Sequence, residues 1–337
     1  MDKIKEIIRT IKEKLFPSGG KKSFMAEMRA GNKVKREKIN WETWKRRNLN
    51  MAGVGRFIWY ILRLVIIIGI SYMILYPFLV KFVVAFSSTE DIVDNTVMYI
   101  PRQGSTYFIE RAMLNMNYWK SFWNTALLSL IVAVFQLFVA SVAGYGFARF
   151  KFKGRDLLFV VVLLTLMIPA QTIQLPLFVR FSHFLGTGLN LINTFWPLVI
   201  LSALGLGLKN GLYIYLMRQF FRGMPKELEN SAYIDGAGFF RTFFSIMLPN
   251  AANMMITVFL FAFTWQWTDT TYNSMLLPKL EILANKATSA AASITDEAQV
   301  MAVNDTACLL IILPLLIVFL FAQRYFIQSI ERSGLVE

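Results

Sequence analysis

The sequence predicts an all-α membrane protein with six transmembrane helices. Hydrophobic residues make up 56% of its 337 residues, and the mean hydropathy is +0.49. Only 17% of the residues are charged, whereas soluble domains carry about 25%. The apolar residues are gathered in long stretches, which is typical of helices that cross a bilayer. These observations exclude an ordinary soluble domain.

The apolar stretches define the predicted spans. A bilayer-crossing helix needs about 20 largely apolar residues, because a rise of about 1.5 Å per residue must cover about 30 Å of hydrocarbon. Six stretches qualify, at residues 57–80, 121–148, 157–179, 194–220, 246–268 and 306–327. They form a predicted membrane domain over residues 57–327, with a cytoplasmic loop at 224–245, an extracytoplasmic loop at 269–305 and a cytoplasmic tail at 328–337.

The first 56 residues form a basic segment. They contain 16 Lys and Arg against 6 Asp and Glu. Residues 1–16 alternate Ile and Leu with Lys and Arg at helical spacing, which predicts an amphipathic basic helix. A cytoplasmic anchor on the lipid surface is the simpler interpretation. A regulatory or partner-docking role is the alternative, and a nucleic-acid partner is not expected.

The charge distribution also predicts the topology. An even number of spans puts both termini on one side of the membrane. If the N-terminus is cytoplasmic, most Lys and Arg lie on the inner segments, as the positive-inside rule requires. We therefore expect a multi-pass membrane protein with both termini in the cytoplasm. The long outer loops at residues 81–120 and 269–305 favour an extracytoplasmic partner or a lid, or they merely connect spans.

Enzyme chemistry is not expected of this chain. It has one cysteine, Cys308, and one histidine, His183, which excludes a cysteine-ligated zinc site and a metal centre with two histidines. The sequence lacks a Walker A pattern, and the nearest sequence, residues 19–23, has the wrong spacing. We therefore expect no bound nucleotide, metal or other cofactor.

The cytoplasmic loop between the fourth and fifth spans carries the most informative motif. Pro225 suits the first position of a helix, and Glu227 and Glu229 fall in the first turn, where carboxylates meet the positive end of the helix dipole. Gly236 then breaks the helix, and residues 246–249 re-enter the membrane. A short cytoplasmic helix linked to two spans is suited to transmit force between a partner protein and the membrane domain.

This loop resembles the EAA loop of binding-protein-dependent ABC importer permeases. The matching residues are Pro225, Glu227, Leu228, Ala232, Asp235, Gly236, Ala237, Leu248 and Pro249. Asn230-Ser231-Ala232 replaces the Glu-Ala-Ala of the family. Resemblance to the sugar-permease branch covers most of residues 60–337, through Tyr76-Pro77-Phe78, Ala143-Gly144-Tyr145-Gly146-Phe147-Ala148-Arg149, Met167-Ile168-Pro169 and Gln323-Arg324-Tyr325-Phe326.

The resemblance implies a type I ABC importer permease fold, maltose-type, with the loop as its coupling helix. It implies import of a carbohydrate, expected to be an oligosaccharide, by alternating access. The implied partners are a second permease subunit, expected in a heterodimer, two ATPase subunits that use ATP and Mg, an extracytoplasmic solute-binding protein, and membrane lipid. The predicted ATPase-coupling residues are Pro225, Glu227, Leu228, Glu229, Ser231, Ala232, Asp235, Gly236 and Ala237.

The substrate path is predicted from polar groups at membrane depth. Lys209 lies about midway across the fourth span, and an intramembrane charge is a functional hypothesis by default. Amides, one charge and aromatic rings suit a carbohydrate, so the candidate lining is Lys209, Asn210, Gln171, Gln174, Trp265, Gln266 and Trp267. The alternative is that the tryptophans anchor the interface and the amides join helices.

Two other classes of protein compete with this interpretation. A secondary, ion-coupled transporter needs intramembrane carboxylates, and the interiors of the predicted spans contain no Asp or Glu. A membrane enzyme needs paired acid–base groups at membrane depth, which are also absent from the sequence. The importer permease accounts for the loop, the spans and the missing nucleotide motif together.

Overall fold

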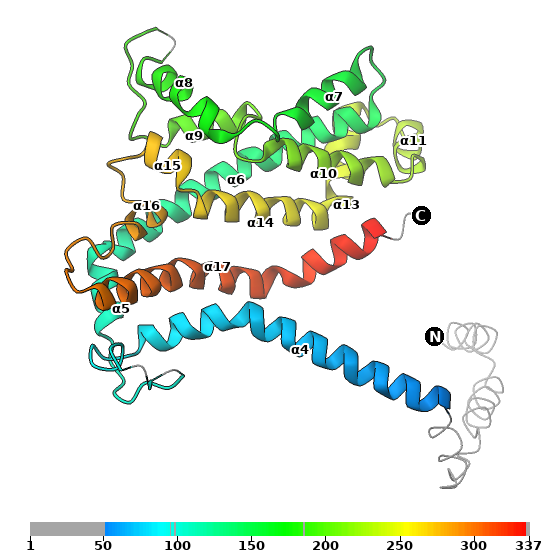
Figure 1. Ribbon diagram of the computed structural model, residues 1–337. Helices are drawn as coiled ribbons and strands as arrows, with labels where there is room; N and C mark the ends of the chain where they lie inside the picture. Colours follow the sequence, from blue (N-terminus) through cyan, green and yellow to red (C-terminus); the bar gives the residue numbers. More distant parts are fainter. Residues whose placement is uncertain (1–50, 95, 98, 185, 335–337) are drawn as a thin grey trace, which may run out of the picture. The chain divides into compact units, whose positions relative to one another are not determined.

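The computed structural model describes residues 51–94, 96–97, 99–184 and 186–334, and their regular elements are helices apart from two isolated bridge pairs (Figure 1). The predicted amphipathic helix at residues 1–16 and the rest of the basic segment up to residue 50 lie outside the described residues. The chain divides into two units, Met1–Leu75 and Tyr76–Glu337.

The described part of the first unit is helical. It forms the beginning of α4 (Met51–Ala85), which continues into the second unit and contains Pro77. From Gly55 to Ala85, α4 is long and apolar enough to cross a membrane. Its length covers the first predicted span at residues 57–80.

The second unit contains the remaining helices. In chain order they are α5 (Tyr107–Asn115), α6 (Tyr118–Arg149), α7 (Arg155–Leu164), α8 (Ala170–Ser182), α9 (Trp196–Ala203), α10 (Asn210–Gly223), α11 (Glu227–Ile234), α12 (Phe239–Thr242), the π-helical turn η1 (Phe243–Met247), α13 (Leu248–Asn250), α14 (Ala252–Thr268), α15 (Thr271–Leu276), α16 (Leu283–Ala287) and α17 (Glu297–Gly334).

The predicted spans differ in their continuity. Among the described helices, α4, α6 and α17 are each long and apolar enough to cross a membrane, and a pair bent by 77°, α12–α13 with α14, adds a fourth candidate. The stretch at 157–179 is interrupted between α7 and α8, where Pro169 is extended. The stretch at 194–220 is interrupted between α9 and α10, where Lys209 has a left-handed backbone. The count of six spans stays a prediction.

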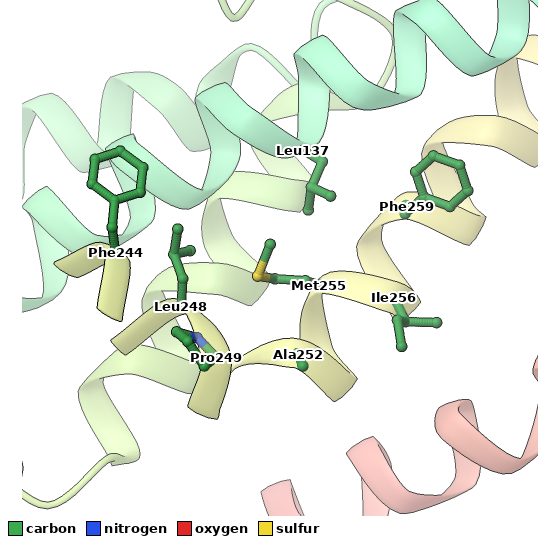
Figure 2. Close-up of a pocket in the computed structure, with 8 residues that line it drawn as sticks. All are labelled: Leu137, Phe244, Leu248, Pro249, Ala252, Met255, Ile256 and Phe259. Carbon is green, nitrogen blue, oxygen red and sulfur yellow. The ribbon is translucent and has the colours of Figure 1, made fainter. Parts of the chain in front are cut away.

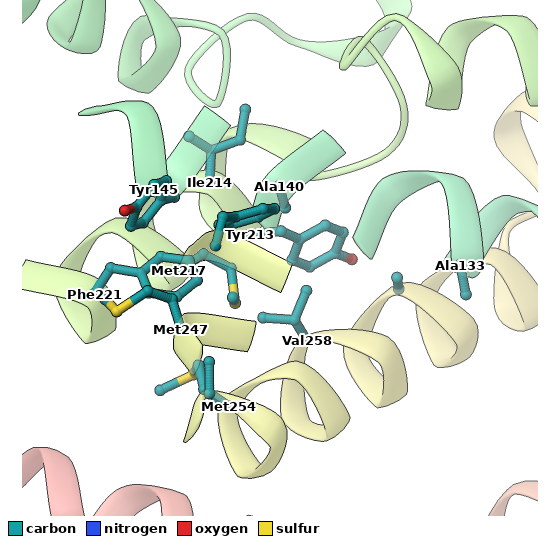
Figure 3. Close-up of a cluster of buried hydrophobic side chains, with 13 residues drawn as sticks. Ala133, Ala140, Tyr145, Tyr213, Ile214, Met217, Phe221, Met247, Met254 and Val258 are labelled. Atoms are coloured by element: carbon teal, nitrogen blue, oxygen red, sulfur yellow. The ribbon is translucent and has the colours of Figure 1, made fainter. Parts of the chain in front are cut away.

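Helices α6, α10 and α14 pack around one apolar cluster (Figure 3). It includes Tyr145, Tyr213, Met217 and Phe221, which are almost completely buried. Helix α6 approaches α10 closely at Gly144, because a Cβ there would lie 2.6 Å from Met217 Cβ. A small residue at such a contact lets two helix backbones approach. The cluster holds α6 against α10, which precedes the 225–238 loop, and against α14.

The outer loop at residues 269–305 is also packed. Leu283, Ala290 and Ala291 are buried in a cluster with side chains of α5, α6 and α17. Asn115 Nδ2 donates a 2.5 Å hydrogen bond to the carbonyl oxygen of Ala290. The centre of the loop therefore belongs to the folded body of the second unit.

Candidate functional site

The loop motif forms a short helix, α11, as predicted. Helix α10 ends where Met224 becomes extended, with ψ at 142°, and Pro225 and Lys226 connect it to α11. Glu227 and Glu229 lie in the first turn of α11. Gly236 follows with a φ of +78°, which an L-residue with a side chain rarely adopts. Helix α11 therefore lies between a proline and a left-handed glycine.

The predicted coupling residues divide into two groups by exposure. Pro225, Glu227, Leu228, Ser231, Asp235 and Gly236 are exposed, Ala237 is half-buried, and Glu229 and Ala232 are buried. A buried carboxylate is uncommon unless it is paired. Glu229 is therefore the residue of α11 whose surroundings need an explanation.

Glu229 is held by two residues from the end of α6. Tyr145 Oη donates a 2.6 Å hydrogen bond to Glu229 Oε1. Arg149 Nε lies 3.3 Å from Glu229 Oε2, and this contact is an ion pair without hydrogen-bond geometry, since Nε has no acceptor. We call Tyr145, Arg149 and Glu229 the Glu229 anchor. Because all three side chains are largely buried, the anchor joins α11 to α6 out of contact with water.

The Glu229 anchor also contacts the end of α10. Arg149 Nη2 donates a 2.7 Å hydrogen bond to the carbonyl oxygen of Met224. The Tyr145 ring packs against aromatic rings on both sides of the loop, namely those of Phe150, Phe221, Phe239 and Phe243. Movement of α11 is therefore opposed by contacts with α6, α10 and the α12–η1 segment together.

Apolar side chains near α11 are exposed beside these buried contacts. Ile234 is 86% exposed and Phe240 is 73% exposed. Leu228 and Tyr233 add further exposed apolar area. Exposed large apolar residues that gather in one region mark a surface for another protein or for lipid.

A second polar contact ties α7 to α10 at the same end of the domain. The Arg218 guanidinium lies 3.9 Å from the centre of the Phe159 ring and 3.8 Å from Asp156 Oδ1. A hydrogen bond from Arg155 to the Asp156 carboxylate holds its pKa below its usual value. These contacts position α7 beside α10.

The candidate substrate-path residues cluster in part. Lys209 Nζ lies 5.2 Å from the centre of the Trp265 ring, as a cation–π contact between the α9–α10 break and α14. Lys209 and Trp265 are both exposed, whereas Asn210 is 2% exposed. Neither Asn210 amide atom has a hydrogen-bond partner among the described residues. The structure therefore brings three of the seven predicted residues to one place.

The other four candidates are placed differently. Gln266 Nε2 donates to Asn273 Oδ1 at 3.1 Å, and Trp267 Nε1 donates to the carbonyl oxygen of Ile311 at 3.1 Å. Both side chains are buried, and these hydrogen bonds join α14 to α15 and to α17. Gln171 and Gln174 lie at the start of α8, exposed and half-buried respectively.

An apolar groove of about 400 Å³ lies beside the bent α13–α14 pair (Figure 2). Its lining is entirely apolar and consists of Leu137, Phe244, Leu248, Pro249, Ala252, Met255, Ile256 and Phe259. A carbohydrate needs hydrogen-bond partners for its hydroxyls, and this lining offers no polar side chain. The groove is therefore suited to apolar contacts, not to a saccharide. The described residues also contain no group of His, Cys, Asp and Glu that could hold a metal ion.

Sequence reasoning missed three functional candidates. Tyr145 and Arg149 were noted only as part of a motif, although their i, i+4 spacing puts both on one face of α6. Gln136 was not selected, yet its side chain is 1% exposed and Nε2 donates a 3.1 Å hydrogen bond to the carbonyl oxygen of Leu208. An amide inside an apolar span was the available signal.

Comparison with known proteins gives consistent matches. The arabinooligosaccharides transport system permease protein AraQ of Halalkalibacterium halodurans is 29% identical over 275 residues, covering 79% of this chain and 92% of that protein. The maltodextrin transport system permease protein MdxG of Bacillus subtilis is 28% identical over 268 residues, covering 79% of this chain and 92% of that protein. A second AraQ, from Bacillus subtilis, is 30% identical over 218 residues, covering 64% of this chain and 73% of that protein.

One solved structure shares the fold. It is a chain of a bacterial ABC transporter involved in the import of the acidic polysaccharide alginate, with a TM-score of 0.65 and 21% identity, and the alignment covers 81% of this chain and 98% of that chain. Residues 136–332 also match the family "Binding-protein-dependent transport system inner membrane component". That match covers α11, the Glu229 anchor and the α9–α10 break. The chain belongs to this family of binding-protein-dependent inner-membrane transport components.

Proposed function

We propose that this chain is the permease subunit of an ATP-driven importer that moves an oligosaccharide from a solute-binding protein into the cytoplasm. The family match over residues 136–332 carries this proposal. Relatives of this chain are permeases for arabinooligosaccharides, maltodextrin and lactose. Carbohydrate is therefore the substrate class that the relatives support.

The permease does not hydrolyse ATP itself. Two partner ATPase subunits bind ATP and Mg, and each pushes on the coupling helix of one permease. In this chain that helix is α11. The exposed side chains of Leu228, Tyr233 and Ile234 supply the apolar contact with the ATPase, and Glu227 and Asp235 supply charge at its edge. A docked ATPase would remove the exposed apolar area from water.

The Glu229 anchor transmits that movement into the membrane domain. Glu229 lies on α11 and its partners lie on α6, one of the long apolar helices. A buried, charge-assisted contact resists separation of the two helices, because its rupture leaves a charge uncompensated. Displacement of α11 would therefore draw the end of α6 with it, which suits a switch between outward-open and inward-open states.

The substrate path passes the α9–α10 break. Interrupted helices at membrane depth are where transporters expose backbone and polar side chains to substrate. Lys209, Asn210 and Trp265 are the residues we assign to the path, and Gln171 and Gln174 are further candidates on α8. Gln266 and Trp267 act as structural supports behind Trp265.

The orientation follows from the coupling helix. Because the ATPase subunits act in the cytoplasm, α11 lies on the cytoplasmic side, and both chain termini are cytoplasmic. The extracytoplasmic loop at residues 269–305 then faces the solute-binding protein. A second permease subunit, different in sequence, completes the path. Its contact with this chain is expected to cover apolar surface of the membrane domain.

Reconstitution tests this function directly. The importer, assembled from both permeases, the ATPase subunits and the binding protein, is placed in liposomes with ATP inside. We expect uptake of a radiolabelled oligosaccharide that requires ATP and the binding protein, and stimulation of ATP hydrolysis by the loaded binding protein. Uptake by this chain alone, driven by an ion gradient without ATPase subunits, would instead identify a secondary transporter.

A further inference from the structure

Lys209 is a cation at membrane depth without a carboxylate partner among the described residues. Helix α10 has 14 residues, so its length of about 21 Å separates Lys209 from the cytoplasmic end of the span. An unpaired lysine near the centre of a bilayer is costly, and such residues usually face a partner or a water-filled cavity. The sequence from residue 157 to residue 226 contains no Asp or Glu. The segment that carries Lys209 therefore supplies no carboxylate of its own, and no described carboxylate is paired with this ammonium group.

The backbone at Lys209 is also unfavourable for this residue. Its φ of +57° is left-handed, a conformation that an L-residue with a side chain adopts only at an energetic cost. Glycine, which carries no such cost, is present at positions 205, 207 and 211 of the same segment. A glycine at position 209 would relieve the strain but would lose the ammonium group. Strain of this kind is typical of functional positions.

Trp265 is the aromatic partner of the Lys209 ammonium group. In the sequence Trp265-Gln266-Trp267, the latter two side chains are buried and hydrogen-bonded within the protein. Trp265 is 46% exposed, and the Lys209 ammonium lies 5.2 Å from the centre of its ring. A cation and a partly exposed aromatic ring, from two separate helical segments, therefore lie in cation–π contact.

The start of α10 adds unpartnered polar atoms. Asn210 is 2% exposed, and both of its amide atoms lack a hydrogen-bond partner in the described part of the chain. Its Nδ2 faces the break, because a Cβ at Gly205 would lie 3.4 Å from it. Gln136 Oε1 is also buried without a partner. Buried polar groups are normally satisfied, so these amides indicate a place for a polar ligand or its water.

We propose that Lys209, Trp265 and Asn210 form a subsite for a carboxylated carbohydrate, such as a uronic acid unit. This inference rests on the proposed function, because it names the substrate class of that importer. The carboxylate pairs with the Lys209 ammonium and meets the positive end of the α10 dipole. The apolar C–H face of the sugar ring packs against Trp265. A neutral sugar can use the indole but leaves the ammonium uncompensated.

The test compares two probes on the assembled importer in nanodiscs, without the binding protein, which would impose its own specificity. The probes are digalacturonate and its neutral counterpart galactobiose, at equal ionic strength. Binding is measured by isothermal titration and by the melting temperature of the complex. We expect digalacturonate to bind about tenfold or more tightly than galactobiose, since a charged hydrogen bond contributes more than a neutral one.

The variants assign that preference to Lys209. Lys209→Met should abolish the preference, and Lys209→Arg should retain it because the charge stays. Trp265→Leu should weaken binding of both probes. Lys279→Met removes an exposed lysine from the outer loop and serves as the matched control that should change nothing.

Three results would overturn the inference: equal affinity of the unmodified importer for both probes, a preference that survives in Lys209→Met, or dissociation of the two permeases in Lys209→Met. The last result would mean that a carboxylate of the second permease, not a substrate, pairs with Lys209. ATP-dependent uptake of an oligosaccharide in the same preparations keeps the proposed function separate. If uptake persists while the preference is absent, only the carboxylate subsite fails.

Discussion

The hydroxyl of Tyr145 donates a 2.6 Å hydrogen bond to the carboxylate of Glu229, and so joins the end of α6 to α11. The two residues are 84 positions apart in the chain. Tyr145 is 2% exposed and Glu229 is 8% exposed. Helix α11, on which we propose that an ATPase subunit acts, is therefore attached through a buried carboxylate to a helix long enough to cross the membrane.

Glu229→Ala should destabilise the protein and uncouple it. The substitution leaves the buried Arg149 without its carboxylate, and breaking a buried ion pair costs about 3–5 kcal/mol. We expect a lower melting temperature of the purified complex. We also expect fewer sugar molecules imported for each ATP hydrolysed, because α11 then moves without α6. Melting and the ratio of uptake to ATP hydrolysis are measured on the same preparation.

Glu227→Ala is the matched control for this variant. Glu227 lies in the same turn of α11 but is exposed. Its removal should leave the melting temperature nearly unchanged, because exposed charges contribute little. If Glu227→Ala and Glu229→Ala lowered the melting temperature equally, the buried contacts of Glu229 would not be what holds α11 on α6.

Tyr145→Phe should produce a milder defect. It removes one hydrogen bond to Glu229 but keeps the ring that packs on Phe221 and Phe243. Loss of a hydrogen bond to a charged group costs about 1.5–3 kcal/mol. Thermal unfolding should show this loss, whereas Tyr215→Phe, whose hydroxyl has only an exposed 3.3 Å contact with Gln219, should not. Equal melting of the two variants would be contrary to this account.

Gly144→Ala should force α6 away from α10. The new Cβ would lie 2.6 Å from Met217 Cβ and 2.9 Å from the backbone nitrogen of Arg218. Overpacking of this kind costs about 1–3 kcal/mol. Gly146→Ala is the control, since its Cβ would meet the Phe150 ring at 3.8 Å, an ordinary contact. Comparable expression and melting of both variants would show that the helices are not in close contact at Gly144.

The outer loop should loosen in acid through Glu281. Hydrogen bonds from Lys120 and Asn117 hold the pKa of Glu281 below its ordinary value of 4.5. A carboxyl group whose pKa is lowered by folding stabilises the folded state above its unfolded pKa. That contribution is lost as the pH falls through the lowered value. Hydrogen exchange in residues 281–291, corrected for the intrinsic exchange rate, should therefore increase as the pH falls from 6 to strongly acidic values.

Glu281→Gln separates this effect from general acid unfolding. The variant should exchange faster already at pH 6, and its exchange, corrected for the intrinsic rate, should change less on acidification. The same pH response in Glu281→Gln and in the unmodified protein would assign the response to other groups.

Helix α11 could be predicted from the sequence because its signals are local. Pro225, the first-turn carboxylates and Gly236 lie within one short segment, and the observed helix runs from Glu227 to Ile234. Which carboxylate is buried could not be predicted. That outcome depends on Tyr145 and Arg149, which are distant in the chain and reach α11 only through the packing of α6 on α10.

The interruptions of two predicted spans were also not predicted. Mean apolarity measures whether a stretch suits lipid, not whether its backbone is one continuous helix. Gly205 and Pro169 were visible in the sequence, but glycine and proline are tolerated in membrane helices. Helix α10 begins after Lys209, whose backbone is left-handed. A lysine in the sequence gives no indication that its backbone will adopt this conformation. The close placement of Lys209 and Trp265 likewise depends on tertiary packing.

The most direct test of the account asks what Ile234 touches in the assembled importer. Ile234 is 86% exposed at the end of α11, and Cys308 is replaced by Ser so that Ile234→Cys carries the sole thiol of the chain. The account predicts that a short bifunctional reagent cross-links this thiol to an ATPase subunit, and that a membrane-impermeant maleimide added outside intact cells does not label it. Labelling from outside, with no cross-link to the ATPase, would contradict the account.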